Sequence, residues 1–98
     1  MLINIVFDYY VDTISVPENI GINISKYQNE CDLWLFNELN DHDFWEKDSS
    51  GEKLGVGICS EAFIYWLNTY IIKDSNEKAY IVQKGISEYD ESLPTLFY

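Results

Sequence analysis

The only histidine, His42, stands between two aspartates in an acidic stretch of the chain. Asp41, His42, Asp43 and Glu46 carry the oxygen and nitrogen atoms that divalent metal ions accept as ligands. Adjacent residues of one loop seldom converge on an ion, however, and no second histidine or cysteine pair supports them. The spacing also lacks the alternating acids and the glycine of an EF-hand. We interpret the stretch as a solvated acidic loop, and predict neither a metal ion nor a cofactor.

A second candidate for chemistry is Cys59, which precedes a predicted helix whose dipole could lower the pKa of the thiol. His42 could be its base, but nothing in the sequence brings these two residues together. There is no G-x-S-x-G motif, and Gly55 and Gly57 lack the third glycine of a dinucleotide-binding fingerprint. Close pairs of carboxylates are expected by chance in a chain with 17 acidic residues. We therefore predict that the protein is not an enzyme.

The charge balance restricts the classes of partner. Six lysines and no arginine oppose 17 acidic residues, which gives a net charge of −11 over 98 residues. Phosphates of nucleic acids and anionic membranes are disfavoured, because both bind clusters of basic residues. A dense negative field instead attracts basic proteins; the alternative is that the acidity only keeps the protein soluble.

The same sequence contains no segment with the features of a signal peptide and none with the apolar length of a membrane span. Cys31 and Cys59 are too few for a disulfide framework and are typical of reduced thiols. These features predict a cytoplasmic protein.

The predicted elements form a single domain over residues 1–98. Residues 2–7 are rich in β-branched side chains and predict an interior strand, whereas residues 8–18 predict a link. Apolar side chains at helical spacing predict a helix over residues 24–39, with Leu33 and Phe36 widening its contact face. Ser60 resembles the N-cap of a second, mostly buried helix that extends to residue 72.

The remaining residues predict short strands and loops. Residues 40–51 and 87–92 predict loops, and residues 54–58, 78–84 and 95–98 predict strands, the second ending at Gly85 and the third lying at an edge. The order of elements favours an α+β fold, a small two-layer domain with two main helices packed on one face of a three- to four-stranded sheet.

Acidic residues concentrate in two stretches with embedded aromatic residues. Carboxylates mixed with Trp, Tyr and Phe suit an interface with a basic protein, since the aromatic side chains act as anchors and the acids pair with Lys or Arg. For Phe44 and Trp45 the alternative is that both side chains fold inward as part of the core. The predicted partner-binding residues are Glu38, Asp41, Asp43, Phe44, Trp45, Glu46, Asp48, Glu52, Glu88, Tyr89, Asp90 and Glu91.

Three segments add a family resemblance to the size and the acidity of the chain. They are residues 34–36 (WLF), 62–68 (AFIYWLN) and 93–97 (LPTLF). With them the chain resembles the immunity proteins of bacterial polymorphic toxin and contact-dependent growth inhibition systems. The resemblance implies that the protein binds and neutralises a cognate toxin, often a basic nuclease, by covering its active site. It implies no catalytic residue.

The charge also fits a second function. An acidic nucleic-acid mimic of the phage anti-defence type would inhibit a DNA-binding protein or a nuclease. Such a mimic requires carboxylates that are spaced regularly, like phosphates, along one face of the molecule.

Overall fold

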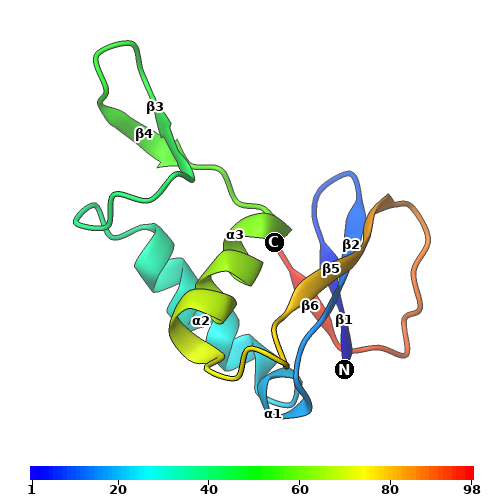
Figure 1. Ribbon diagram of the computed structural model, residues 1–98. Coiled ribbons are helices and arrows are strands. Elements are labelled where there is room, and N and C mark those ends of the chain that lie inside the picture. Colours follow the sequence, from blue (N-terminus) through cyan, green and yellow to red (C-terminus); the bar gives the residue numbers. More distant parts are fainter.

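A mixed four-stranded sheet organises the chain, with the strand order β5-β2-β1-β6 (Figure 1). In the computed structural model, which describes residues 1–98, β1 (Leu2–Val6) pairs antiparallel with β2 (Val11–Ser15). It pairs in parallel with β6 (Thr95–Phe97), and β2 pairs antiparallel with β5 (Tyr80–Ile86). The interior position of β1 and the edge position of β6 are therefore confirmed.

The segment 8–18 was wrongly predicted as a link, because it contains β2. The sequence pattern did not predict this strand because of Asp12 and Thr13. Aspartate is depleted in strands, and two successive polar residues break the pattern of a buried segment. Both side chains are nevertheless buried. The Thr13 hydroxyl donates a hydrogen bond to Asn4 Oδ1, at 3.2 Å. Hydrogen-bond partners outside the strand thus make a polar strand compatible with burial.

Asp12 joins the sheet to the second long helical segment. Its Oδ2 accepts a hydrogen bond of 2.6 Å from the Ser60 hydroxyl, and its Oδ1 accepts one of 2.9 Å from the Gly85 amide. Ser60 is therefore the first residue of α3 (Ser60–Trp66) and not its N-cap, which is Cys59. Gly85 was also predicted wrongly, since β5 continues through it with a φ of 67° and an irregular register against β2.

Two short helices precede the acidic stretch. α1 (Glu18–Gly21) follows Pro17, and α2 (Ile24–Leu35) ends four residues before the predicted boundary of residue 39. The early end has a local cause, because two side chains from the following loop satisfy the last carbonyl groups. Asn40 Nδ2 lies 2.9 Å from the oxygen of Trp34, and His42 Nε2 lies 2.9 Å from that of Leu35.

The hydrophobic core contains residues from the sheet and from the helices. α3 continues directly into a π-helical turn, η1 (Leu67–Ile71), close to the predicted end at residue 72. None of these helices is both long enough and apolar enough to cross a membrane. The largest fully buried apolar side chains are Ile3, Ile5, Ile14, Leu35, Phe63 and Leu67. Together these elements form an α+β domain.

The predicted loop 40–51 contains a strand, which the sequence analysis missed. β3 (Trp45–Lys47) pairs antiparallel with β4 (Lys53–Val56) in a separate two-stranded sheet that extends away from the body (Figure 1). Asp48 shapes the turn, since its Oδ1 accepts hydrogen bonds from the amides of Ser50 and Glu52, both at 2.9 Å. The turn-forming residues at positions 48–51 therefore connect the two strands of a hairpin and are not part of an irregular loop.

We predict that Asp12→Ala lowers the free energy of unfolding by about 2–4 kcal/mol, because it leaves the Ser60 hydroxyl and the Gly85 amide without an acceptor. Urea denaturation measures the change. Asp8→Ala is the matched control, because Asp8 is exposed and its substitution by alanine removes the same charge. Equal stability of the two variants would contradict the structural role of Asp12.

Candidate interaction surface on the hairpin

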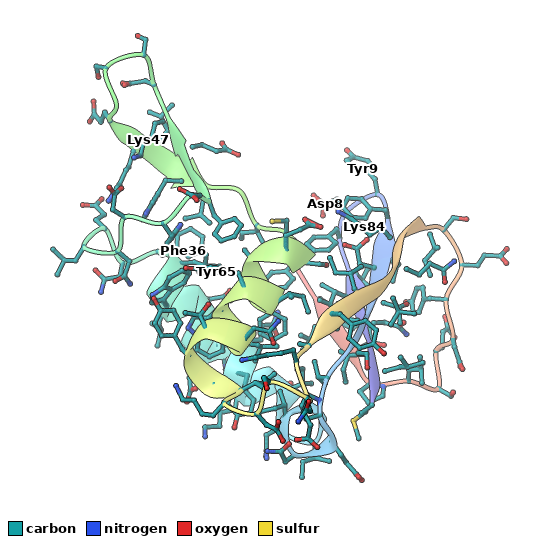
Figure 2. All side chains as sticks on the ribbon, viewed as in Figure 1. Asp8, Tyr9, Phe36, Lys47, Tyr65 and Lys84 are labelled. Carbon is teal, nitrogen blue, oxygen red and sulfur yellow. The ribbon has the colours of Figure 1, made fainter.

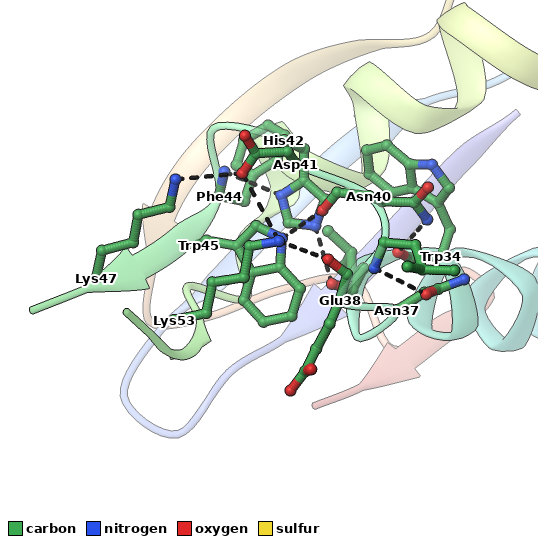
Figure 3. Close-up of polar contacts among 12 residues, drawn as sticks. Trp34, Asn37, Glu38, Asn40, Asp41, His42, Phe44, Trp45, Lys47 and Lys53 are labelled. Atoms are coloured by element: carbon green, nitrogen blue, oxygen red, sulfur yellow. Dashed lines mark hydrogen bonds and ion pairs between the residues drawn. The ribbon is translucent and has the colours of Figure 1, made fainter. Parts of the chain in front are cut away.

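A cluster of aromatic rings fastens the hairpin to the helices (Figure 3). The His42 ring stacks on Trp45 at a centroid distance of 5.2 Å and lies 4.7 Å from Trp34 of α2. Phe44 lies 5.8 Å from Tyr65 of α3 and packs against the hydrophobic core. The Trp45 indole N–H donates to the carbonyl of residue 40 at 2.6 Å. Phe44 and Trp45 are thus half-buried and face inward.

Both ring nitrogens of His42 are occupied within the chain. Nδ1 accepts a hydrogen bond of 3.1 Å from the Phe44 amide, so the proton of the neutral ring is on Nε2. Nε2–H therefore donates to the Leu35 carbonyl at 2.9 Å. His42 caps α2 and positions β3, and neither nitrogen is free to bind a metal ion or to act as a base. No three His, Cys, Asp or Glu side chains lie close enough together to hold a metal ion.

Two lysines hold part of the acidic stretch in place. Lys47 Nζ lies 3.2 Å and Lys53 Nζ 3.7 Å from Asp41 Oδ1. Lys53 also donates to the Glu38 carbonyl at 2.6 Å and stands 5.0 Å from the centre of the Trp45 ring. The hydrogen bond from Lys47, reinforced by the charges of both lysines, lowers the pKa of Asp41. Asp41 is therefore a structural carboxylate of the hairpin base.

Asp48 is occupied in the same way. Its carboxylate accepts hydrogen bonds from the Ser50 hydroxyl, at 2.6 Å, and from the amides of Ser50 and Glu52. These hydrogen bonds lower the pKa of Asp48, and the bond from the Ser50 hydroxyl has the largest effect. The side chain is thus used to close the turn of the hairpin.

The other acids of this stretch are exposed and form no ion pair within the chain. Two leucines beside them are also open to solvent, Leu39 with 91% and Leu54 with 69% of its surface exposed. An uncovered apolar side chain among unpaired carboxylates is typical of a binding surface. We call these residues the hairpin surface: Glu38, Leu39, Asp43, Glu46, Glu52 and Leu54.

The second predicted acidic stretch lies elsewhere on the molecule. Residues 87–94 run along the side of the sheet away from the hairpin (Figure 1). The buried Asn4 amide donates to the Asp90 carbonyl at 2.8 Å, and Asp90 Oδ1 accepts from the Ser92 hydroxyl at 2.6 Å. Tyr89 is half-buried, whereas Glu88 and Glu91 are exposed. The structure therefore does not bring the two predicted stretches together on one surface.

Sequence analysis missed the exposed apolar residues at the end of α2. Leu33 and Phe36 were expected to pack against a neighbouring element, but 76% and 52% of their surfaces are exposed. Both line a shallow depression together with Asn29, Asp32 and Asn37. Asn37 and Asn40 could have indicated the earlier end of the helix, because asparagines favour helix ends and turns. Because α2 ends at Leu35, Leu39 is not part of the apolar face of this helix.

The environment of Cys59 does not activate its thiol. Burial, together with the nearby Glu61 carboxylate, raises the pKa of Cys59, and burial raises that of Cys31 to about 12. A raised pKa leaves less thiolate at neutral pH, and the thiolate is the nucleophile.

We predict that Cys59 reacts with iodoacetamide at pH 7 more slowly than glutathione does, as measured by mass spectrometry. Faster labelling than glutathione would show an activated cysteine.

We predict that His42→Phe costs about 1–3 kcal/mol in unfolding free energy, because it keeps a ring but removes the partners of the Phe44 amide and the Leu35 carbonyl. His42→Ala should cost more, since the ring contacts are also lost. Urea denaturation gives both values, and hydrogen exchange of the Phe44 amide reports loosening of the hairpin. A His42→Phe variant with unchanged stability and exchange would contradict the capping role.

No protein-family model, no curated protein and no solved structure matched this chain.

Proposed function

We propose that this protein is an immunity protein that binds and neutralises a cognate basic toxin, such as a nuclease, through the hairpin surface. The observation that carries the proposal is a projecting hairpin with carboxylates that no cation of the chain neutralises and with two exposed leucines. Lysines and arginines of a toxin would pair with the carboxylates, and the two leucines would lose their contact with water on binding.

The rigidity of the hairpin base supports this function. The stack of His42 on Trp45, the Asp41 ion pairs and the Asp48 turn hold the backbone of the hairpin before any partner arrives. A preorganised surface loses less conformational entropy on binding. A net charge of −11 also opposes pairing of two copies of the chain and favours a cationic partner.

A nucleic-acid mimic that inhibits a DNA-binding protein is the alternative, and the distribution of acids favours it less. Residues 38–52 and 88–91 lie on different parts of the molecule (Figure 1). Asp41, Asp48 and Asp90 are engaged in contacts within the chain. A continuous row of phosphate-like carboxylates would need these groups to face the partner together.

The proposal has further parts. The protein acts as a non-enzymatic inhibitor in the cytoplasm. Its partner is a protein, and neither a nucleic acid nor a membrane. We also propose that α2 and α3 form one layer over a single face of the main sheet, so that the hairpin extends from the helical layer.

Co-expression with the product of the adjacent gene tests the function. We expect the two proteins to co-purify as a complex, and we expect growth to be rescued when the adjacent gene encodes a growth inhibitor. The association should weaken as salt rises from low to physiological concentration, because exposed charges steer the encounter. Absence of both a complex and rescue would refute the proposal.

Three double variants locate the binding surface, and each removes the same two charges. Glu46→Gln with Glu52→Gln alters the hairpin, Glu88→Gln with Glu91→Gln alters the second stretch, and Glu18→Gln with Glu77→Gln alters exposed positions outside both stretches. We expect the hairpin variant alone to lower the association rate constant with the toxin, by about 3- to 10-fold. Equal effects of all three would mean that only net charge matters, and would exclude the hairpin as the contact.

A further inference from the structure

An aromatic pocket lies outside the hairpin surface, at the tip of the main sheet. It has a volume of about 350 Å³ and is lined by Phe7, Asp8, Tyr9, Tyr10, Ile58 and Tyr98. Phe7 is stacked between two tyrosines, with ring centroids 4.9 Å from Tyr10 and 5.7 Å from Tyr98. Stacking of three rings fixes one wall of the pocket. Tyr9 extends from the β1–β2 turn with 96% of its surface exposed, so both faces of its ring are accessible (Figure 2).

The charges around this pocket select the sign of a ligand. Asp8 is the one charged residue of the lining; it is exposed and forms no ion pair. Lys84, which is drawn near Asp8 in Figure 2, is engaged in an ion pair with Glu61. The nearby carboxylate of Asp12 is buried and accepts two hydrogen bonds. The free charge at the pocket is therefore negative.

We propose that this pocket binds the cationic head of an arginine or lysine side chain of the partner protein. Aromatic faces attract organic cations within about 6 Å of the ring centre, and a neighbouring carboxylate strengthens the attraction. The apolar wall suits the aliphatic stem of such a side chain. An anion is repelled by the Asp8 carboxylate, whereas a neutral group gains nothing from its charge.

The position of the pocket links it to the proposed inhibitory function, on which the choice of a protein side chain rests. Gly57 follows β4, and its amide donates to the Phe44 carbonyl at the base of the hairpin, at 2.8 Å. The next residue, Ile58, lines the pocket. The linker that leaves the base of the hairpin therefore contributes to the pocket wall, and we assign the basic side chain to the same partner that binds the hairpin surface.

Titration with small peptides tests the pocket without the toxin. The probe is acetyl-Gly-Arg-Gly-amide, and the same peptide with citrulline is the control, because citrulline has nearly the shape of arginine without its charge. We expect the arginine peptide to shift the amide NMR signals of Tyr9, Tyr10 and Ile58 with a dissociation constant on the order of 1–10 mM. The lysine peptide should shift the same signals, and the citrulline peptide should not.

Two variants and two matched controls localise the effect. Tyr9→Ala should weaken binding of the arginine peptide about 5-fold, and Asp8→Asn about 3- to 10-fold. Tyr80→Ala and Asp74→Asn change an exposed tyrosine and an exposed aspartate outside the pocket, so binding should be unchanged. Because Tyr9 and Asp8 are exposed, these variants are expected to fold, which thermal denaturation checks.

Equal shifts with the citrulline peptide would overturn the assignment of a cationic ligand and indicate a neutral occupant. No shift at these three amides up to 50 mM peptide, or equal losses in the control variants, would overturn the pocket itself. Failure of the arginine peptide to bind would not affect the co-expression assays, because complex formation and growth rescue test the proposed function separately. If the pocket binds the arginine peptide but complex formation and growth rescue both fail, only the assignment of a toxin as the source of the side chain is lost.

Discussion

The Asp12 carboxylate, on the second residue of β2, holds three parts of the fold together. It accepts hydrogen bonds from the first residue of α3 and from the irregular part of β5. A buried carboxylate is tolerated only when its oxygens are satisfied, and Ser60 and Gly85 satisfy both of them. The position of the start of α3 relative to β2 and β5 depends on this contact.

The hairpin depends on a second set of polar contacts, centred on His42. This residue ends α2 through the Leu35 carbonyl and positions β3 through the Phe44 amide. Its stacking on Trp45 and the nearby ion pairs of Asp41 fix the base of the hairpin. The residues with the most obvious potential for chemistry therefore have structural roles. The carboxylates and leucines left free around them form the candidate surface.

Alternation and periodicity were sufficient for the elements whose burial follows from apolar residues. β1, the N-terminal part of α2, α3 with η1, and β6 were predicted on that basis. β2 was missed because Asp12 and Thr13 are buried against polar partners outside the strand, Ser60 and Asn4, which the local sequence pattern does not reveal. The end of α2 was misplaced because side chains at positions 40 and 42 satisfy its last carbonyls. β3 was missed because a stretch dense in acids and turn residues pairs with β4 only once Asp48 closes the turn.

The sequence by itself determined the net charge of −11, the α+β character and the two stretches in which acidic residues are concentrated. Only the tertiary structure decided which of these acids remain free. Asp41, Asp48 and Asp90 are used by lysines, hydroxyls and amides, whereas Glu38, Asp43, Glu46 and Glu52 are not paired. It also exposed Leu39 and Leu54 and assembled an aromatic pocket from residues 7–10, 58 and 98. The physical reason is that pairing and exposure depend on neighbours in space, which the spacing of residues along the chain does not specify.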